Sequence, residues 1–240
     1  MSAILETRGL SRHFRGVIAS EDINFVLAAG EVRAVIGPNG AGKTTFLSMI
    51  SGHLRPSAGR VLYKGVDITK RSIVHRARLG IVRKFQTPTV FDNLSAHRNI
   101  ELAVLRTDCP RRERDERIGT VLQRVRLQDQ ADTPAQFLSH GQRQWLEIGL
   151  LVAIRGELLL LDEPTAGMTA EETAATGDLV TMLARDMELS VIIIEHDINF
   201  IRDLRAPVTV LHLGRILKEG SFEEVAEDER VREVYLGTGS

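Results

Sequence analysis

The sequence contains a single cysteine, and this scarcity excludes two classes of site. Cys109 has no second thiol in the chain, so neither an intrachain disulfide framework nor a cysteine-based zinc site can form. We therefore expect the protein to work in a reducing compartment. Cys109 precedes Pro110 in a polar stretch that gives no indication of an activated thiol, so we assign it no catalytic role.

Long apolar runs are also missing. No segment approaches the ~18 consecutive apolar residues that a membrane-spanning helix requires. The first ten residues, MSAILETRGL, lack the apolar core of a signal peptide. We therefore expect a soluble, cytoplasmic protein. If it works at a membrane, another chain must hold it there.

Neither sign of charge dominates the chain. The formal net charge is -1, so no overall basic field favours nucleic acid or an anionic membrane as a partner. The basic cluster RRERDER, from Arg111 to Arg117, also contains acids, which favours a solvated helix face. The 240 residues, 43% of them hydrophobic, suffice for one large or two small domains with a sizeable core.

The spacing of apolar residues divides the chain into an α/β core and a helical insertion. Short β-like runs open the sequence, and the continuous apolar runs of buried parallel strands return near its end. Between about Thr87 and Ile154 the spacing is helical. We expect one domain, with its core formed by residues 1–86 and 155–240 and a helical subdomain at 87–154. The stretch APVTVLHLGRILKEG predicts a closing hairpin.

A glycine-rich phosphate-binding motif follows the third predicted strand. GPNGAGKT, from Gly37 to Thr44, matches G-x-x-x-x-G-K-[ST] in full and lies between an apolar strand and a helical pattern. The glycines allow backbone N–H groups to surround phosphates, and the start of the helix adds the positive end of a dipole. We expect Lys43 to reach the β- and γ-phosphates and Thr44 to bind Mg²⁺.

Two acids end a later apolar strand in the stretch LLLLDEP. Asp162 suits a direct or water-mediated partner of Mg²⁺. Glu163, the next residue, is placed to polarise the attacking water. Read alone, two acids at a strand end are usually a solvated turn, but their place after a phosphate-binding motif favours the functional interpretation.

Three further residues gain a candidate role only from their positions. His196 follows another strand and belongs to the same row of strand ends as Gly37 and Asp162, where open α/β sheets bind ligands. Gln86 lies between a strand and the helical insertion, where it can contact the metal site and also move the helical insertion relative to the core. Phe14 is either a core residue or an exposed aromatic that stacks on adenine.

Taken in order, five segments resemble those of the ATPases of ATP-binding cassette (ABC) transporters, and the resemblance covers essentially the whole chain. GPNGAGKTT, FQTP, LSHGQRQ, LLLLDEP and IIIEHD correspond to the Walker A, Q-loop, signature, Walker B and switch-histidine segments. The resemblance implies a P-loop NTPase core of the ABC ATPase type, with an antiparallel β subdomain and an inserted α-helical subdomain. It also implies ATP hydrolysis, with ATP and Mg²⁺ as cofactors.

The family motifs transfer roles to individual residues of this chain. The implied catalytic residues are Glu163, His196, Gln86 and Lys43. The implied metal-site residues are Thr44, Gln86 and Asp162. The implied nucleotide-binding residues are Phe14, Gly37, Pro38, Asn39, Gly40, Ala41, Gly42, Lys43, Thr44, Thr45, Ser139, Gly141 and Gln142.

The signature departs from the family's usual LSGGQ at one position. In this family two ATPases pair head to tail, so Ser139 and the backbone of Gly141 would contact the γ-phosphate held by the partner's Walker A. His140 replaces the neighbouring glycine, and its side chain can point away if the backbone conformation is open to a non-glycine residue. We therefore interpret the motif as working. Thr169 replaces the usual aspartate after Walker B, which removes a carboxylate contact across the dimer.

Within the family, the chain resembles the ATPases of importers for branched-chain amino acids and short amides. KFQTPTVF, SHGQRQWLEIG, DEPTAGMT and VREVYLG are most similar to the urea-importer ATPase. The alternatives are a branched-chain amino acid importer ATPase, a lipid-export ATPase and a soluble cassette protein without a permease.

The resemblance also implies partners and a location. It implies integral membrane permease subunits and a second ABC ATPase subunit, identical or different, and no nucleic acid. Membrane contact would be made only through the permease, at the inner face of the cell membrane. We expect the region from Gln86 to about Asn99 to face the permease, with Val90, Phe91 and Leu94 as an apolar cluster.

Overall fold

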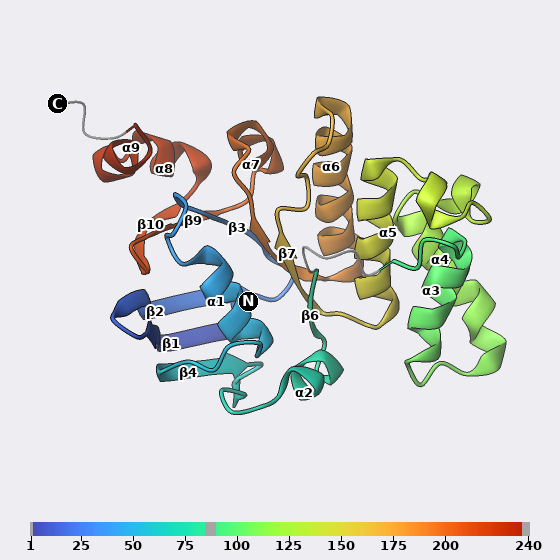
Figure 1. The fold of residues 1–240 in the computed structure, drawn as a ribbon, viewed down its shortest axis with the longest axis horizontal. Coiled ribbons are helices and arrows are strands. Elements are labelled where there is room, and N and C mark those ends of the chain that lie inside the picture. The colour runs from blue at the N-terminus through green and yellow to red at the C-terminus, as the bar shows by residue number, and fades with distance from the viewer. Residues whose placement is uncertain (1, 85–89, 237–240) are drawn as a thin grey trace.

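The computed structural model describes residues 2–84 and 90–236, apart from the side chain of Leu236. Two β-sheets pack beside a group of helices (Figure 1). In that described part, no helix is long and apolar enough to cross a membrane. The predicted α/β architecture, with an antiparallel sheet and an inserted helical part, is confirmed.

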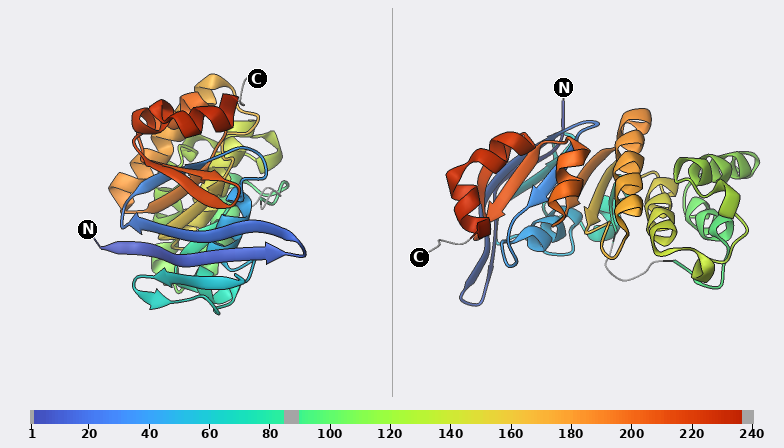
Figure 2. Two further views of the ribbon diagram at one scale, coloured as in Figure 1. Left: turned by 90° about the vertical axis from the view of Figure 1, so that its left-hand side faces the viewer. Right: turned by 90° about the horizontal axis from the view of Figure 1, so that it is seen from above.

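The first sheet is antiparallel and its strands come from the first third of the chain. Its order is β2-β1-β4-β5, and its long strands β1 and β2 run side by side across the molecule (Figure 2). The hairpin between them, at residues 15–16, was not foreseen from the sequence. The strands are β1 (Ala3–Phe14), β2 (Val17–Ala28), β4 (Ala58–Tyr63) and β5 (Val66–Asp67).

The main sheet has the order β10-β9-β3-β8-β7-β6. Adjacent strands in it are parallel, except for β9 and β10, which form the antiparallel hairpin predicted from the sequence. Its leucine- and isoleucine-rich strands are buried on both faces, as parallel strands between layers require. The strands are β3 (Val32–Ile36), β6 (Ile81–Arg83), β7 (Leu158–Asp162), β8 (Ser190–Ile194), β9 (Val208–His212) and β10 (Arg215–Gly220).

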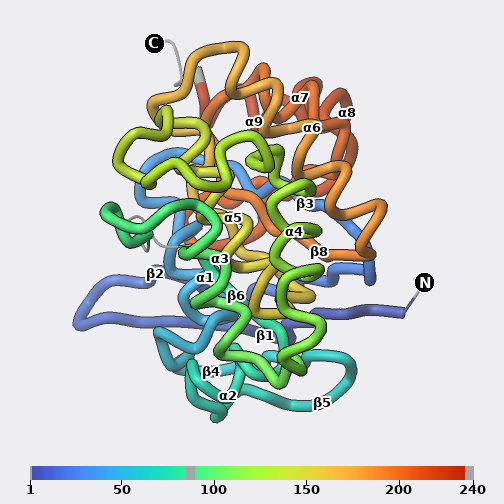
Figure 3. The backbone as a smooth tube through the Cα atoms, turned by 90° about the vertical axis from the view of Figure 1, so that its right-hand side faces the viewer, coloured from blue at the N-terminus to red at the C-terminus, as the bar shows by residue number. Residues whose placement is uncertain are grey.

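The helices of the described residues fall into three groups. Two follow the phosphate-binding motif and β5, namely α1 (Lys43–Ser51) and α2 (Ile73–Arg78). Three form the helical subdomain seen face-on in Figure 3, namely α3 (Ala96–Leu105), α4 (Arg114–Arg124) and α5 (His140–Ala153). The remaining four are α6 (Ala170–Met187), α7 (Ile198–Leu204), α8 (Phe222–Glu227) and α9 (Glu229–Leu236).

Figures 1 and 2 show how the helix groups are placed. Helix α6 stands between the main sheet and α5, and α8 and α9 lie at the opposite end of the molecule from α3 and α4. Three short 3-10 helices join the subdomain: Arg111–Glu113, Gln128–Gln130 and Ala135–Phe137.

The hydrophobic core lies on both faces of the main sheet. Because side chains alternate along a strand, Leu159 and Leu161 of β7 pack on the face covered by the helical subdomain, α6 and α7. Leu158 and Leu160 pack on the other face, against α1 and the antiparallel sheet. Cys109 is buried in the first of these clusters, at 5% exposure.

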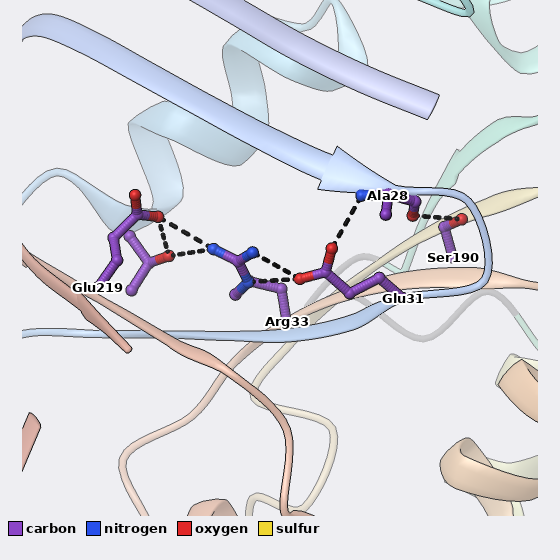
Figure 4. A network of polar contacts seen from close by, with 6 residues as sticks. Ala28, Glu31, Arg33, Ser190 and Glu219 are labelled. Atoms are coloured by element: carbon purple, nitrogen blue, oxygen red, sulfur yellow. Dashed lines mark hydrogen bonds and ion pairs between the residues drawn. The ribbon is translucent and has the colours of Figure 1, made fainter. Parts of the chain in front are cut away.

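A polar network fixes the start of β3, at the end of the strand away from the phosphate-binding motif (Figure 4). Arg33 donates to Glu31 (2.7 Å), to Thr209 of β9 (3.1 Å) and to Glu219 of β10 (3.0 Å). Glu31 in turn accepts from the backbone N–H of Ala28, at the end of β2, at 2.8 Å. The network therefore ties the antiparallel sheet to the main sheet.

The buried Arg76 of α2 braces the far end of α1. Its guanidinium donates to the carbonyl oxygens of Met49 (2.7 Å), Ile50 (2.6 Å) and Thr69 (2.9 Å). Burial lowers the pKa of Arg76 to about 10, and the negative charge of Asp67 opposes that shift. A cation at the C-terminal carbonyls of a helix complements the helix dipole, so Arg76 steadies the helix whose first turn carries Lys43.

Candidate functional site

The phosphate-binding motif forms a loop between β3 and α1. At two positions of this loop, only glycine can be accommodated. Gly37 and Gly42 have φ angles of 151° and 98°. A Cβ on Gly37 would lie 2.1 Å from the carbonyl oxygen of Leu211, and one on Gly42 would lie 2.4 Å from that of Ala19. The loop is thus pressed against strands β9 and β2, which fixes the direction of its backbone N–H groups.

Lys43 curls back over this loop from the first turn of α1. Its Nζ donates to the carbonyl oxygens of Gly37 (2.6 Å) and Pro38 (3.0 Å), and the residue is 7% exposed. Burial lowers the pKa of Lys43, while the negative charges of Glu163 and Asp162 act in the opposite direction. A flexible ammonium group held by loop carbonyls is well placed to contact phosphate oxygens.

Asp162 ends β7 and is paired with a second buried charge. Arg83, at the end of β6, donates to its Oδ2 at 2.7 Å and to Ser48 of α1 at 2.8 Å. The side chains of Arg83 and Asp162 are only 8% and 2% exposed. The pairing of Asp162 with Arg83 could not be read from the sequence, because it joins residues 79 positions apart.

The donors at this edge fit a magnesium ion that arrives with a nucleotide. Within residues 2–84 and 90–236, no group of three His, Cys, Asp or Glu side chains could hold a metal by itself. Mg²⁺ keeps several waters and usually takes one or two protein oxygens plus phosphates. Thr44 at the start of α1 and Asp162 at the end of β7 carry oxygens of this kind, and their binding of Mg²⁺ stays a prediction.

Glu163 and His196 meet at the same edge of the sheet. His196 Nε2 lies 3.0 Å from Glu163 Oε1, and both side chains are partly exposed. Glu163 has a φ of 50°, a conformation uncommon for residues other than glycine. Its backbone N–H donates to the carbonyl of Ile194 at 2.9 Å. The strand-end row expected from the sequence therefore brings an acid and a histidine into contact.

The residue before His196 organises both loops, and nothing in the sequence pattern had singled it out. Glu195 is 4% exposed and accepts from the backbone N–H (2.9 Å) and hydroxyl (2.6 Å) of Thr165. Its other oxygen accepts from the backbone N–H of His196 at 3.0 Å. Glu195 thus links the loop that starts at Glu163 to the loop that carries His196. Its signal in the sequence was only an acid directly after a buried strand.

The signature segment forms the start of α5. Ser139 caps the helix in a capping box with Gln142: the Ser139 hydroxyl accepts from the Gln142 N–H, and the Gln142 side chain accepts from the Ser139 N–H. His140 has a helical backbone, so histidine needs no strained conformation there. Its side chain does not simply point away: Nε2 lies 2.8 Å from the carbonyl oxygen of Ala166.

Thr169 has a local role in place of the usual aspartate. Its hydroxyl accepts from the N–H of Glu172, and the Glu172 side chain accepts from the N–H of Thr169, which caps α6. The other oxygen of Glu172 accepts from the hydroxyl of Ser139 (3.0 Å) and the N–H of Gly141 (3.3 Å). In the described part of the chain, no hydrogen bond joins the signature to the phosphate-binding loop.

The last two residues with a predicted role are Phe14 and Gln86. Phe14, at the end of β1, is 43% exposed, and the guanidinium of Arg12 lies 4.5 Å from its ring centroid. It is therefore an exposed aromatic and not a core residue, and its stacking on adenine stays a prediction. Gln86 lies outside the described residues.

Comparisons with known proteins agree with this geometry. The family model described as "ABC transporter" matches residues 20–166, and the one described as "Branched-chain amino acid ATP-binding cassette transporter" matches residues 216–240. The chain is 36% identical over 238 residues to the lipopolysaccharide export system ATP-binding protein LptB of Acidithiobacillus ferridurans, covering 99% of this chain and 98% of that protein.

Two more relatives cover the chain almost completely. The high-affinity branched-chain amino acid transport ATP-binding protein LivG of Escherichia coli K12 is 30% identical over 249 residues, with 98% of each chain covered. The solved structure of MJ1267, an ATP-binding cassette of an ABC transporter in its ADP conformation, superposes with a TM-score of 0.88 at 26% identity. That match covers 99% of this chain and 100% of MJ1267.

Proposed function

This chain belongs to the ABC transporter family as an ATP-binding, ATP-hydrolysing subunit, and we propose that it powers the import of branched-chain amino acids. The observation that carries the solute class is the match of residues 216–240 to the branched-chain amino acid model. The full-length similarity to LivG supports it. Permease subunits and a second ATPase subunit complete the proposed importer at the inner face of the membrane.

We assign hydrolysis to the sheet edge where Lys43, Asp162, Glu163 and His196 lie. Glu163 accepts a proton from the attacking water, whose oxygen bonds to the γ-phosphorus as the bond to ADP breaks. His196 orients the Glu163 carboxylate through their 3.0 Å contact. Lys43 stabilises the charge that spreads over the phosphate oxygens. Mg²⁺, when bound by Thr44 and Asp162, supplies further positive charge there.

The signature completes the site of a second subunit. Its donors, the Ser139 hydroxyl and the Gly141 N–H, lie at the start of a 14-residue helix and contact α6, not the phosphate-binding loop of the same chain. We propose that they bind the γ-phosphate of ATP on the partner, which makes the working unit a dimer with two shared ATP sites. Gln142 supports them through the capping box.

The permease contact is assigned to Phe91. Its side chain is 59% exposed, whereas Val90 and Leu94 are partly buried, so the predicted apolar cluster reduces to one exposed ring. The buried Asn99 fixes the segment: its side chain accepts from the N–H of Phe91 at 2.8 Å and donates to the carbonyls of Phe91, Leu94 and Ser95. A rigidly presented apolar side chain suits a protein partner.

Two other solutes remain as alternatives. The 36% identity to LptB favours lipopolysaccharide export as a second candidate. Urea, which the signature with His140 suggested, is not named by any relative described above and stays a prediction. The three solutes differ enough to be separated by uptake and export measurements on one reconstituted system.

The experiment that tests the proposal combines a variant with a solute assay. We expect Glu163→Gln to lower kcat by roughly 10²–10⁴ while ATP still binds, because the amide cannot accept the proton. Exposed Glu171→Gln is the matched control and should keep wild-type turnover. Wild-type activity in Glu163→Gln would exclude Glu163 as the base. Uptake of labelled leucine by the reconstituted importer supports the solute class, and uptake of urea alone would contradict it.

A further inference from the structure

The carboxylate of Glu172 occupies the start of α5, where the proposed function places the γ-phosphate of the partner's ATP. Its Oε1 accepts from the hydroxyl of Ser139 at 3.0 Å and from the N–H of Gly141 at 3.3 Å. These two groups are the donors assigned to the phosphate. Both a carboxylate and a phosphate are anions that accept from such donors at a helix N-terminus.

The approach of Glu172 to the signature backbone is close. A Cβ added to Gly141 would lie 2.7 Å from Glu172 Oε1 and 2.8 Å from its Cδ. Hydrogen bonds from the N–H of Thr169 and the hydroxyl of Ser139, with a further one from Gly141, hold the pKa of Glu172 below its ordinary value. The group is therefore a carboxylate at neutral pH, seated directly against the backbone that a phosphate would need.

The same contact reaches the loop that carries the catalytic acid. Glu172 Oε2 accepts from the N–H of Thr169 at 3.1 Å, at the end of the loop that starts at Glu163. A second tie runs from His140 to the carbonyl oxygen of Ala166 in that loop. Through these two side chains, the signature of the single subunit is bonded to its own catalytic loop.

We propose that Glu172 substitutes for the γ-phosphate in the unpaired subunit and is displaced when the ATP of a partner docks on the signature. Two anions repel each other and cannot share the donors of Ser139 and Gly141. Displacement requires only a side-chain rotation, because Oε2 can stay with Thr169 in the capping box. Docking of ATP on one subunit thereby loosens the link between its signature and its loop 163–169. This inference rests on the proposed function of the signature.

The test measures how tightly the full-length chain dimerises. In a Glu163→Gln background, which we expect to keep ATP bound without hydrolysing it, dimerisation is followed by analytical ultracentrifugation at a series of protein concentrations with saturating Mg·ATP. Glu172→Gln keeps the size of the side chain and the capping box but removes the competing charge. We expect it to tighten the dimer by roughly two- to fivefold per ATP site, the range for exposed charge contacts.

Two variants control the result. Glu171→Gln removes a neighbouring exposed acid that has no hydrogen bond or ion pair within the described residues, and it should leave the dimer unchanged. Glu172→Asp keeps the charge but retracts it by one methylene, so it should tighten the dimer as Glu172→Gln does. Nucleotide affinity of the monomer should stay the same in all variants, since within the described residues Glu172 makes no hydrogen bond or ion pair with the loop Gly37–Thr44 of its own chain.

The outcomes separate the inference from the proposed function. An ATP-dependent dimer that is unchanged or weaker in both Glu172 variants overturns the inference and identifies Glu172 as a structural brace, while the shared ATP sites stand. Absence of an ATP-dependent dimer in every variant overturns the shared sites and the inference with them. A tighter dimer with Glu171→Gln as well would attribute the effect to net charge and overturn the specific role of Glu172.

Discussion

Replacing Arg83 with methionine should destabilise the protein by removing the partner of a buried carboxylate. Arg83 and Asp162 lie 2.7 Å apart with side chains 8% and 2% exposed. Methionine keeps the length and the apolar contacts of the arginine stem, so the main loss is electrostatic. Asp162 then remains buried with its charge and without this hydrogen-bonded cation.

The size of the effect follows from the burial. Removing one partner of a buried ion pair costs about 3–5 kcal/mol. The nearby ammonium of Lys43 attracts Asp162 and compensates part of the loss, so we expect Arg83→Met to lower the free energy of unfolding by about 3 kcal/mol. For a chain of this size, 1 kcal/mol shifts Tm by about 2–4 °C, which gives a decrease of roughly 6–12 °C. Thermal unfolding followed by circular dichroism at pH 7 measures it.

Two companion measurements make the reasoning refutable. Arg83→Met combined with Asp162→Asn should regain most of the lost Tm, because the unpaired charge is gone. Mg·ATP should raise the Tm of Arg83→Met by more than it raises that of the wild type, since a divalent cation at Asp162 replaces the missing arginine. If Arg83→Met lowers Tm by less than about 2 °C, the smallest shift that corresponds to 1 kcal/mol, the pairing of Arg83 with Asp162 does not contribute the stability proposed here. The same conclusion follows from a double variant that is no more stable than Arg83→Met.

Two further predictions concern the signature and the permease contact. His140→Gly should keep ATPase activity within a few-fold of the wild-type value, whereas Ser139→Arg should abolish it. Of these two residues, only Ser139 is proposed to bind the γ-phosphate. His140→Gly should also lower the free energy of unfolding by about 1–2 kcal/mol, because glycine is a poor helix former and the hydrogen bond to Ala166 is lost. If His140→Gly and Ser139→Arg lose activity equally, the histidine has a catalytic role of its own. Phe91→Asp should abolish transport while basal ATPase activity and Tm stay at wild-type values, and unchanged transport would remove Phe91 from the permease interface.

The sequence predicted the parts of the site that local patterns determine. The phosphate-binding loop needs glycines at fixed positions, and Gly37 and Gly42 lie where their Cβ atoms would clash. The rule that parallel strands end at one edge of the sheet predicted His196 in the same row as Gly37 and Asp162, and the structure adds its contact with Glu163. These predictions depend on residues close together in the chain, or on a single topological rule.

What the sequence did not predict depends on contacts between distant residues. Glu195 holds Thr165 from 30 positions away, and Glu172 reaches Ser139 from 33 positions away. An acid in either position looks like any other solvated acid until the fold brings its donors to it. Helices α8 and α9, which follow the hairpin β9–β10, were not predicted, because segments of six and eight residues are too short to show a clear helical spacing of apolar residues. The histidine of the signature was expected to turn away, but a backbone carbonyl lay within its reach.

The strand order of the main sheet has a consequence for how the protein is made. Strand β3, which precedes the phosphate-binding loop, is synthesised early, yet it pairs with β8 and β9: Val32 aligns with Val191, and Ala34 with Val208. On the ribosome, β3 therefore emerges long before either neighbour exists. Such distant pairings fold slowly and leave apolar strand edges open to association meanwhile. Strand β3, and with it the loop that it supports, can therefore be paired on both sides only after Val208–Val210 of β9 have been synthesised, close to the end of translation.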